Sequence, residues 1–177
     1  ADDLRRRDFT VNAIALSLNL GSRGLLLDPS NGAADLEAKL LRILHNYSFL
    51  DDPSRLIRAT RFSARFHWPL EDRTQARDDA AKENEYIQYI SDRSIGLEIQ
   101  QLAHEDDPLH VLRALEKEGW LKVLHPRWGV AKVDTAGLSA LMKARQQMTE
   151  VGISVDASAA VMHFITRRLS GPDVKEI

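Results

Sequence analysis

The chain has 177 residues, of which 44% are hydrophobic and 28% charged, so it is long and apolar enough to fold around a core. It contains no cysteine, which excludes disulfides, thiolate metal sites and a cysteine nucleophile. No apolar run approaches the roughly 18 residues of a membrane helix, and the start of the chain is too charged for a signal peptide. We therefore expect a cytoplasmic protein that is neither inserted into a membrane nor secreted.

The formal net charge of -2 hides an uneven distribution along the chain. The segment 71–108 is acidic, with 11 acidic and 4 basic residues, whereas the segment 53–70 holds four arginines and no acidic residue. A partner responds to the local charge that it meets more than to the net charge. The basic segment is therefore the first place to look for an anionic ligand.

Both ends of the sequence suggest that it is an internal piece of a longer protein. Residue 1 is not Met, and the first methionine is Met142. The last residues, 170–177, resemble a cap, a proline and acidic residues that open a further helix. The alternative is a processed but otherwise complete domain.

Near the start, the pattern predicts a small β-hairpin between helical segments. A short helix is expected within 8–16, followed by period-2 alternation over 16–20, a turn at 21–24 and a second strand at 25–27. After a loop, apolar residues at helical spacing predict a helix over 33–44.

Helices are predicted to dominate the rest of the chain. Cap residues and prolines indicate helices over 53–67, 74–90, 92–104 and 108–118, from 134 onward, and over 157–169. The expected fold is therefore mainly α, with a small β remnant near 14–28 whose edge is exposed. Six large apolar residues are expected to be mostly buried at helix contacts: Leu56, Phe62, Phe66, Trp68, Trp120 and Leu124.

Four arginines follow the helix predicted over 53–67 at a spacing that places them along one stripe: Arg55, Arg58, Arg61 and Arg65. Apolar residues occupy most of the remaining circumference, so the arginines should face a cleft instead of open water. Such a cleft favours a ligand that carries phosphate. The alternative is a solvated basic face on a helix that Asp52 merely caps.

No group of residues predicts a metal site. The carboxylates occur as adjacent pairs whose members point in different directions, and the six histidines lack the spacing of metal ligands. The pairs are Asp2 and Asp3, Asp51 and Asp52, and Asp78 and Asp79.

Three segments in order, Leu4–Ala13, Asp28–Leu36 and Asp52–Arg55, closely resemble the template-independent RNA nucleotidyltransferases of the bacterial type. This family contains the tRNA CCA-adding enzymes and the bacterial poly(A) polymerases. The resemblance covers about residues 3–66, with a weaker likeness over 107–126.

The resemblance implies three regions. Residues 1–44 would be the C-terminal part of the nucleotidyltransferase head, residues 45–105 a helical neck that recognises the nucleotide base, and residues 106–177 part of a helical body that binds RNA. The parent protein would transfer C, A or both from CTP and ATP to the 3′ ends of tRNA or other RNA. The alternative is a non-catalytic helical module that binds RNA or protein on the same scaffold.

Six positions correspond to the nucleotide site of the family: Arg7, Asp8, Asp52, Arg55, Arg58 and Arg61. By resemblance, the first two contact the phosphates and the ribose, the next two read the base, and the last two complete the site. Asp51 stands where the family usually has Glu, so its side chain is one methylene shorter and reaches less far toward Arg55.

The catalytic centre is expected upstream of residue 1. The resemblance implies Mg²⁺ held by an Asp-x-Asp pair beside a Gly-Gly phosphate loop, and neither pattern occurs in this sequence. We therefore predict no catalytic residue and no metal ligand in this chain, and no transferase activity for the chain alone.

Overall fold

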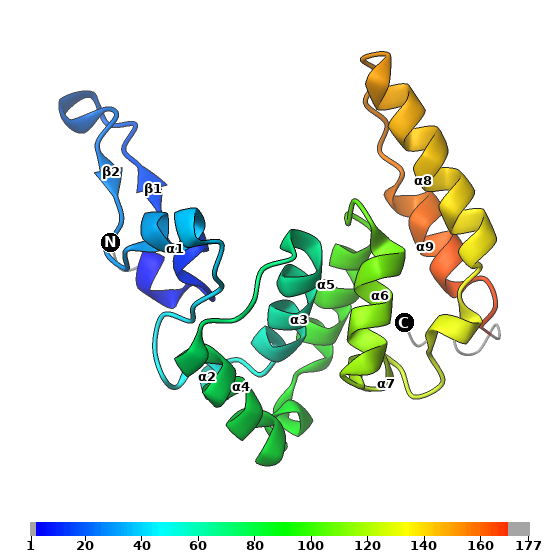
Figure 1. The fold of residues 1–177 in the computed structure, drawn as a ribbon, viewed down its shortest axis with the longest axis horizontal. Coiled ribbons are helices and arrows are strands. Elements are labelled where there is room, and N and C mark those ends of the chain that lie inside the picture. Colours follow the sequence, from blue (N-terminus) through cyan, green and yellow to red (C-terminus); the bar gives the residue numbers. More distant parts are fainter. Residues whose placement is uncertain (1–2, 170–177) are drawn as a thin grey trace. The chain divides into compact units, whose positions relative to one another are not determined.

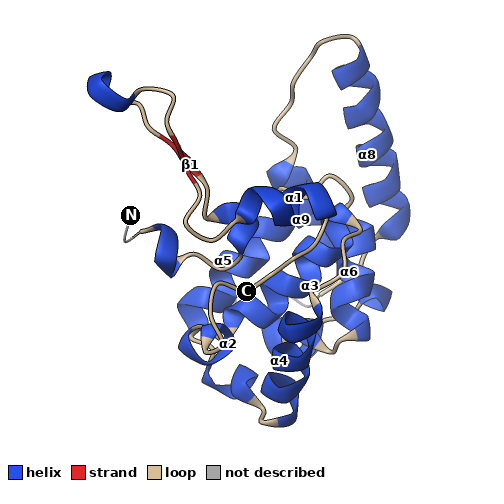
Figure 2. Cartoon of the chain, turned by 60° about the vertical axis from the view of Figure 1, so that its left-hand side comes forward, coloured by secondary structure: helices blue, strands red, loops and turns tan. Residues whose placement is uncertain are grey.

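The chain consists mostly of short helices, with a single two-stranded hairpin in the part that the structure describes (Figure 2). The computed structural model describes residues 3–169, so the helix expected from residues 170–177, and Asp2, lie outside the described residues. The chain divides into two units, Ala1–Ile90 and Ser91–Ile177. The prediction of a mainly helical fold with a small β element is confirmed.

A buried aspartate fixes the first helical turns of the N-terminal unit. The 3₁₀ helix η2 (Thr10–Asn12) packs against α1 (Gly32–Ala38), where Asp35 is buried. Thr10 donates from Oγ1 to Asp35 at 2.6 Å, and Arg42 donates from Nε to the same carboxylate at 3.0 Å. Because a buried charge needs such partners, this group ties η2 firmly to α1.

The predicted hairpin is present, and its leucines are exposed. Strands β1 (Ala15–Leu16) and β2 (Leu26–Leu27) pair antiparallel (Figure 1). The loop that joins them contains η3 (Leu20–Ser22). Leu18 and Leu20 are 75% and 95% exposed. Within residues 3–169 no further strand pairs with β1 or β2, and Leu16 and Leu26 of these strands are 57% and 55% exposed, as expected for an exposed β edge.

Helix α1 ends earlier than the apolar spacing predicted. The sequence predicted a helix over 33–44, but Lys39 adopts a left-handed backbone with φ 55° and ends the helix after Ala38. Leu41 and Ile43 then form isolated β-bridges with other residues of the N-terminal unit, and both are buried. Tertiary pairing thus overrides the local helical pattern.

We expect Gly32→Ala to destabilise the N-terminal unit by about 1–3 kcal/mol, the usual cost of overpacking. A Cβ at Gly32 would clash with the backbone oxygen of Thr10, which cannot rotate away. Denaturant unfolding measures the loss. Gly21→Ala is the matched control, because no atom lies within 4 Å of a Cβ there. An equal loss in both variants would contradict this packing.

Helix α3 (Ser54–Phe66) confirms the helix predicted over 53–67, and His67 ends it with φ 55°. Along the chain, α3 is preceded by α2 (Ser48–Asp51), which the sequence did not predict. It is followed by α4 (Asp72–Glu83) and then by η4 (Tyr86–Tyr89). Leu56 is fully buried on α3, as predicted.

The aromatic residues at the end of α3 are less buried than predicted. Phe66 is 39% exposed, and Phe62 and Trp68 are only half-buried. Their rings form a row. The ring centroid of Phe66 lies 5.8 Å from that of Phe62 and 5.0 Å from that of Trp68. Phe66 is the last residue of the helix, so neighbouring rings cover only part of it. Trp120 and Leu124 are buried as predicted.

In the described part of the second unit, Ser91 to Leu169, every regular element is a helix. Ser91, Asp107 and Asp134 each accept a backbone N–H three residues later, and so cap three helices. These starts confirm the predicted ones. The elements are α5 (Asp92–Leu102), α6 (Pro108–Lys117), α7 (Trp120–Leu124), η5 (Val130–Lys132), α8 (Thr135–Glu150) and α9 (Ser158–Thr166). No helix within residues 3–169 combines the length and the apolar character needed to cross a membrane.

Candidate functional site

Two distant sequence motifs of the N-terminal unit meet around a polar cavity of about 350 Å³, which we call the arginine cavity. One motif begins at the end of η1 (Leu4–Arg6) and continues to Asn12. The other runs from Asp52 into the first turns of α3. Both motifs contribute to the lining: Arg6, Arg7, Asp8, Asn12, Asp52, Arg55 and Arg58. Five of the six residues named from the sequence are thus brought together, and Arg61 is not among them.

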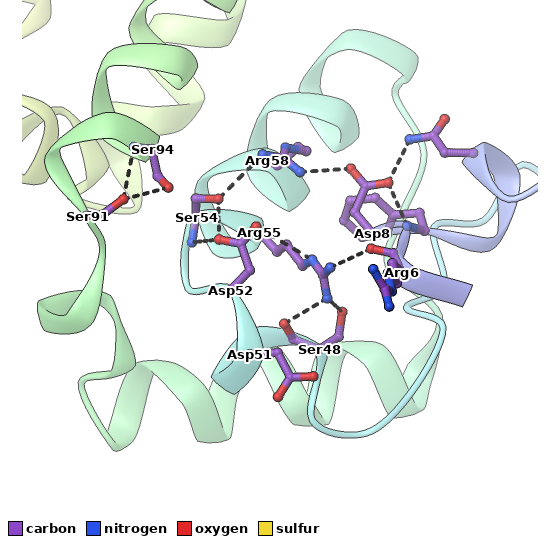
Figure 3. Close-up of polar contacts among 12 residues, drawn as sticks. Arg6, Asp8, Ser48, Asp51, Asp52, Ser54, Arg55, Arg58, Ser91 and Ser94 are labelled. Carbon is purple, nitrogen blue, oxygen red and sulfur yellow. Dashed lines mark hydrogen bonds and ion pairs between the residues drawn. The ribbon is translucent and has the colours of Figure 1, made fainter. Parts of the chain in front are cut away.

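Three hydrogen bonds hold the Arg55 side chain in the arginine cavity. Its Nη1 donates to the carbonyl oxygen of Ser48 at 3.1 Å and to the Ser48 hydroxyl at 2.8 Å. Its Nη2 donates to the carbonyl oxygen of Arg6 at 2.9 Å (Figure 3). Arg55 is only 8% exposed, and its Nε is buried with no hydrogen-bond partner among residues 3–169. The guanidinium therefore lies in one fixed orientation.

Asp52 has one oxygen engaged and one without a hydrogen bond. Oδ1 accepts from the Ser54 backbone N–H at 3.1 Å and from the Ser54 hydroxyl at 2.6 Å, so it caps the start of α3. Oδ2 lies 3.8 Å from Nε of Arg55, which is an ion-pair distance and too long for a hydrogen bond. This second oxygen is available to accept from a ligand.

Asp8 and Arg58 join the two motifs across the arginine cavity. Asp8 accepts from the Phe9 backbone N–H at 2.8 Å and from Asn12 at 2.9 Å on Oδ1, while Arg58 donates to Oδ2 at 3.2 Å. Arg58 also reaches the Ser54 hydroxyl at 3.4 Å. A continuous polar chain thus runs from Asn12 through Asp8 and Arg58 to the residues that hold Asp52 (Figure 3).

Arg7 lies at the exposed rim of the arginine cavity. It pairs with Asp3 at 2.8 Å, and this hydrogen bond lowers the pKa of Asp3 and raises that of Arg7. Both side chains are more than half exposed. Such a surface pair contributes little to stability, so Arg7 can exchange its partner for a ligand anion at small cost.

The predicted stripe of four arginines separates into two pairs. Arg55 and Arg58 line the arginine cavity, whereas Arg61 is 3% exposed and lies over the Phe62 ring at 4.8 Å. Arg65 lies over the same ring at 5.4 Å. The predicted role of Arg61 in a nucleotide site stays a prediction.

The lining of the arginine cavity carries four guanidinium groups and two carboxylates, so its formal charge is positive. Guanidinium groups recognise phosphate through paired N–H groups and keep their charge at any physiological pH. The combination of phosphate-binding cations with one available carboxylate oxygen suits a ligand that has both an anionic part and a hydrogen-bond donor.

A larger cavity of about 870 Å³ lies in the second unit, lined by residues of α6 and α8. Its lining balances three carboxylates against Arg113, Lys143 and Arg145, and Arg145 is already paired with Asp106 at 2.9 Å. Because these charges cancel, they select neither an anion nor a cation. The arginine cavity is therefore the stronger candidate site.

The carboxylates of the described residues do not fit a magnesium ion. No group of three or more His, Cys, Asp or Glu side chains between residues 3 and 169 is close enough to hold a metal. Asp8 is engaged by Arg58, and Asp78 by Lys82 at 2.7 Å. Mg²⁺ requires several convergent oxygen ligands, and residues 3–169 do not bring such a group together.

Comparison with known proteins gives a consistent result. The family of the poly A polymerase head domain matches residues 1–42. The A-adding tRNA nucleotidyltransferase of Halalkalibacterium halodurans is 42% identical over 117 residues, covering 65% of this chain and 27% of that protein. The CCA-adding enzyme of Marinobacter nauticus is 37% identical over 145 residues, covering 79% of this chain and 37% of that enzyme. The chain belongs to the bacterial CCA-adding nucleotidyltransferase family.

A solved structure is similar over nearly the whole chain. It is a tRNA nucleotidyltransferase complexed with a primer tRNA and an incoming ATP analog, with a TM-score of 0.74 and 29% identity. The match covers 99% of this chain and 53% of that one. The chain thus spans 27% of the first of these relatives, 37% of the second and 53% of the solved chain. The resemblance identified from the sequence motifs is confirmed.

Sequence reasoning missed three groups that build the site. Ser48, Ser54 and the backbone carbonyl of Arg6 orient the predicted residues, and none of them carries a charge. Ser54 follows an Asp-Pro helix start, where a hydroxyl within reach of the cap could have been suspected. Ser48 gives no comparable signal, because only the packing of α2 against α3 brings it to Arg55.

Proposed function

We propose that the chain supplies the nucleotide-recognising part of an RNA nucleotidyltransferase. The full-length parent would add C, A or both from CTP and ATP to the 3′ ends of tRNA or other RNA, with Mg²⁺ bound outside this chain. In this proposal residues 1–44 belong to the head, 45–105 to the neck and 106–177 to an RNA-binding body. The observation that carries it is the placement of Asp52 beside Arg55 in the arginine cavity.

This pair is suited to the bases C and A. Cytosine and adenine each present an amino donor next to a ring-nitrogen acceptor on their pairing edges, whereas uracil and guanine present carbonyl and N–H groups there. Oδ2 of Asp52 would accept from the amino group, and the Arg55 guanidinium would donate to the ring nitrogen. One carboxylate and one guanidinium therefore serve both accepted bases and reject the other two.

The remaining residues of the arginine cavity would bind the triphosphate. Arg7 and Arg58 provide positive charge, and Asp8 holds Arg58 in place through the 3.2 Å ion pair. Phosphate contacts to exposed arginines are screened by salt, so nucleotide binding should weaken as the ionic strength rises.

The test is extension of a tRNA that lacks its 3′ end by the full-length parent, with each of the four nucleoside triphosphates and Mg²⁺ supplied separately. Addition of C, A or both, with UTP and GTP refused, is the expected result. Failure to extend with any nucleotide, by a folded protein that still binds RNA, would favour the non-catalytic binding module.

We expect Arg58→Ala in the full-length parent to raise the KM for nucleotide about tenfold, because a hydrogen bond to a charged group is lost, with a smaller change in kcat. The same measurement on Arg65→Ala is the control, since Arg65 lies against aromatic rings and does not line the arginine cavity. Arg61→Ala, measured alongside, tests the role predicted for Arg61. Equal KM values for Arg58→Ala and the unaltered protein would remove Arg58 from the site.

A further inference from the structure

The groups that orient the Arg55 side chain lie outside the Asp51–Arg55 motif. Its neighbours in the motif are Asp51 and Asp52, yet its hydrogen bonds go to Ser48, the first residue of α2, and to the carbonyl of Arg6. The short helix α2 thus supplies hydrogen-bond acceptors to a guanidinium that is carried by α3.

Ser48 is built into this contact. The residue is completely buried, at 0% exposure, and supplies two acceptors to one nitrogen of Arg55, its hydroxyl at 2.8 Å and its carbonyl at 3.1 Å. The Arg6 carbonyl accepts from the other terminal nitrogen at 2.9 Å. Because a guanidinium is planar, acceptors at both terminal nitrogens fix its plane as well as its position.

Asp51 does not share this role. Its side chain is 59% exposed, and its Oδ2 lies 3.7 Å from Nε2 of His45. All the side-chain hydrogen bonds of Arg55 within residues 3–169 are accounted for by Ser48 and Arg6. The carboxylate expected from the motif therefore leaves the orientation of Arg55 to other groups.

We propose that Ser48 is a positioning residue for base selection, which orients the Arg55 guanidinium toward the ring nitrogen of the incoming base. The proposal rests on the proposed function, in which Arg55 reads that base. A long side chain that is already ordered loses less rotamer freedom when the ligand binds, and a fixed donor direction rejects bases that lack an acceptor there. Ser48 thus acts on nucleotide recognition through Arg55, without touching the nucleotide.

The test uses Ser48→Ala and Ser48→Cys in the full-length parent. Alanine removes the hydroxyl acceptor, and cysteine replaces it by a weak acceptor of similar shape, so the second variant keeps the site filled if the first is poorly folded. We expect the preference for ATP and CTP over UTP and GTP, measured as kcat/KM ratios, to fall about tenfold in each, the change that follows from losing one hydrogen bond to a charged group. The loss should appear in KM more than in kcat.

Asp51→Ala is the matched control, because Asp51 lies in the same short helix as Ser48 and, among the described residues, forms neither a hydrogen bond nor an ion pair with Arg55. It should keep the nucleotide preference of the unaltered protein. The decisive measurement repeats Ser48→Ala in an Arg55→Lys background, where no guanidinium is left to orient. There the serine substitution should cause no further loss of preference, since the two residues act as one unit.

Two results would overturn the proposal. Full preference in both Ser48 variants would show that the hydroxyl does not orient Arg55, and an undiminished loss in the Arg55→Lys background would show that Ser48 acts on something else. Failure of the proposed function is recognised separately, because Arg55→Lys alone would then leave the preference unchanged.

Discussion

In the full-length parent, Asp52→Ala should weaken discrimination against UTP and GTP by about 1–3 kcal/mol, the usual worth of a bidentate base contact. Among the described residues Oδ2 of Asp52 has no hydrogen-bond partner, and it is the carboxylate oxygen available to a base amino group. The measurement is the ratio of kcat/KM for CTP and ATP to that for UTP and GTP. Folding should be weakened only by the lost cap, which costs about 0.5–2 kcal/mol.

Asp52→Asn separates the two roles of this side chain. The amide oxygen of Asn can still accept from Ser54 and cap α3, but the NH₂ group then replaces Oδ2 and can only donate. Asn should therefore match Ala in lost discrimination while keeping more of the stability. If Asn retains the preference for CTP and ATP while Ala loses it, the effect arises from the cap, and Asp52 does not read the base.

The sequence predicted the helices that begin with a strong cap and failed where tertiary pairing decides. The starts after Ser91, Asp107 and Asp134 were correct because the capping side chains act locally. The helix expected over 33–44 is wrong beyond Ala38, because Leu41 and Ile43 are buried in β-bridges whose partners lie far away in the sequence. Local periodicity contains no information about such partners.

The candidate site shows the same division between local and long-range information. Charged residues at motif positions pointed to Asp8, Asp52, Arg55 and Arg58, and the structure brings these four around one cavity. The family resemblance also named Arg61, and its role in the nucleotide site stays a prediction. Helical spacing placed Arg61 on one stripe with Arg55, but the spacing could not show that Arg61 lies over the Phe62 ring and does not line the cavity. Uncharged groups from other elements, such as the Ser48 hydroxyl, could be found only from the fold.

The 177-residue chain alone should not extend RNA. Its arginines can position a triphosphate, but they neither activate a 3′-hydroxyl nor supply a base for its proton. Asp8 is held by Arg58 and Asn12, and in the proposed function Oδ2 of Asp52 accepts from the base, so neither carboxylate of the arginine cavity is left to take that proton. The assay incubates the purified chain with Mg²⁺, labelled CTP or ATP, and tRNA that lacks its 3′ end, beside the full-length parent.

The outcomes of this assay locate the catalytic centre. Extension by the chain alone, free of contaminating host enzyme, would place catalysis within residues 1–177 and contradict the prediction. Weak nucleotide or RNA binding that falls steeply with added salt is compatible with it, because arginine contacts to phosphate survive without catalysis. Extension that appears only after a separately purified head fragment is added would show that the two pieces complement each other, with base selection supplied by Asp52 and Arg55 and chemistry by the head.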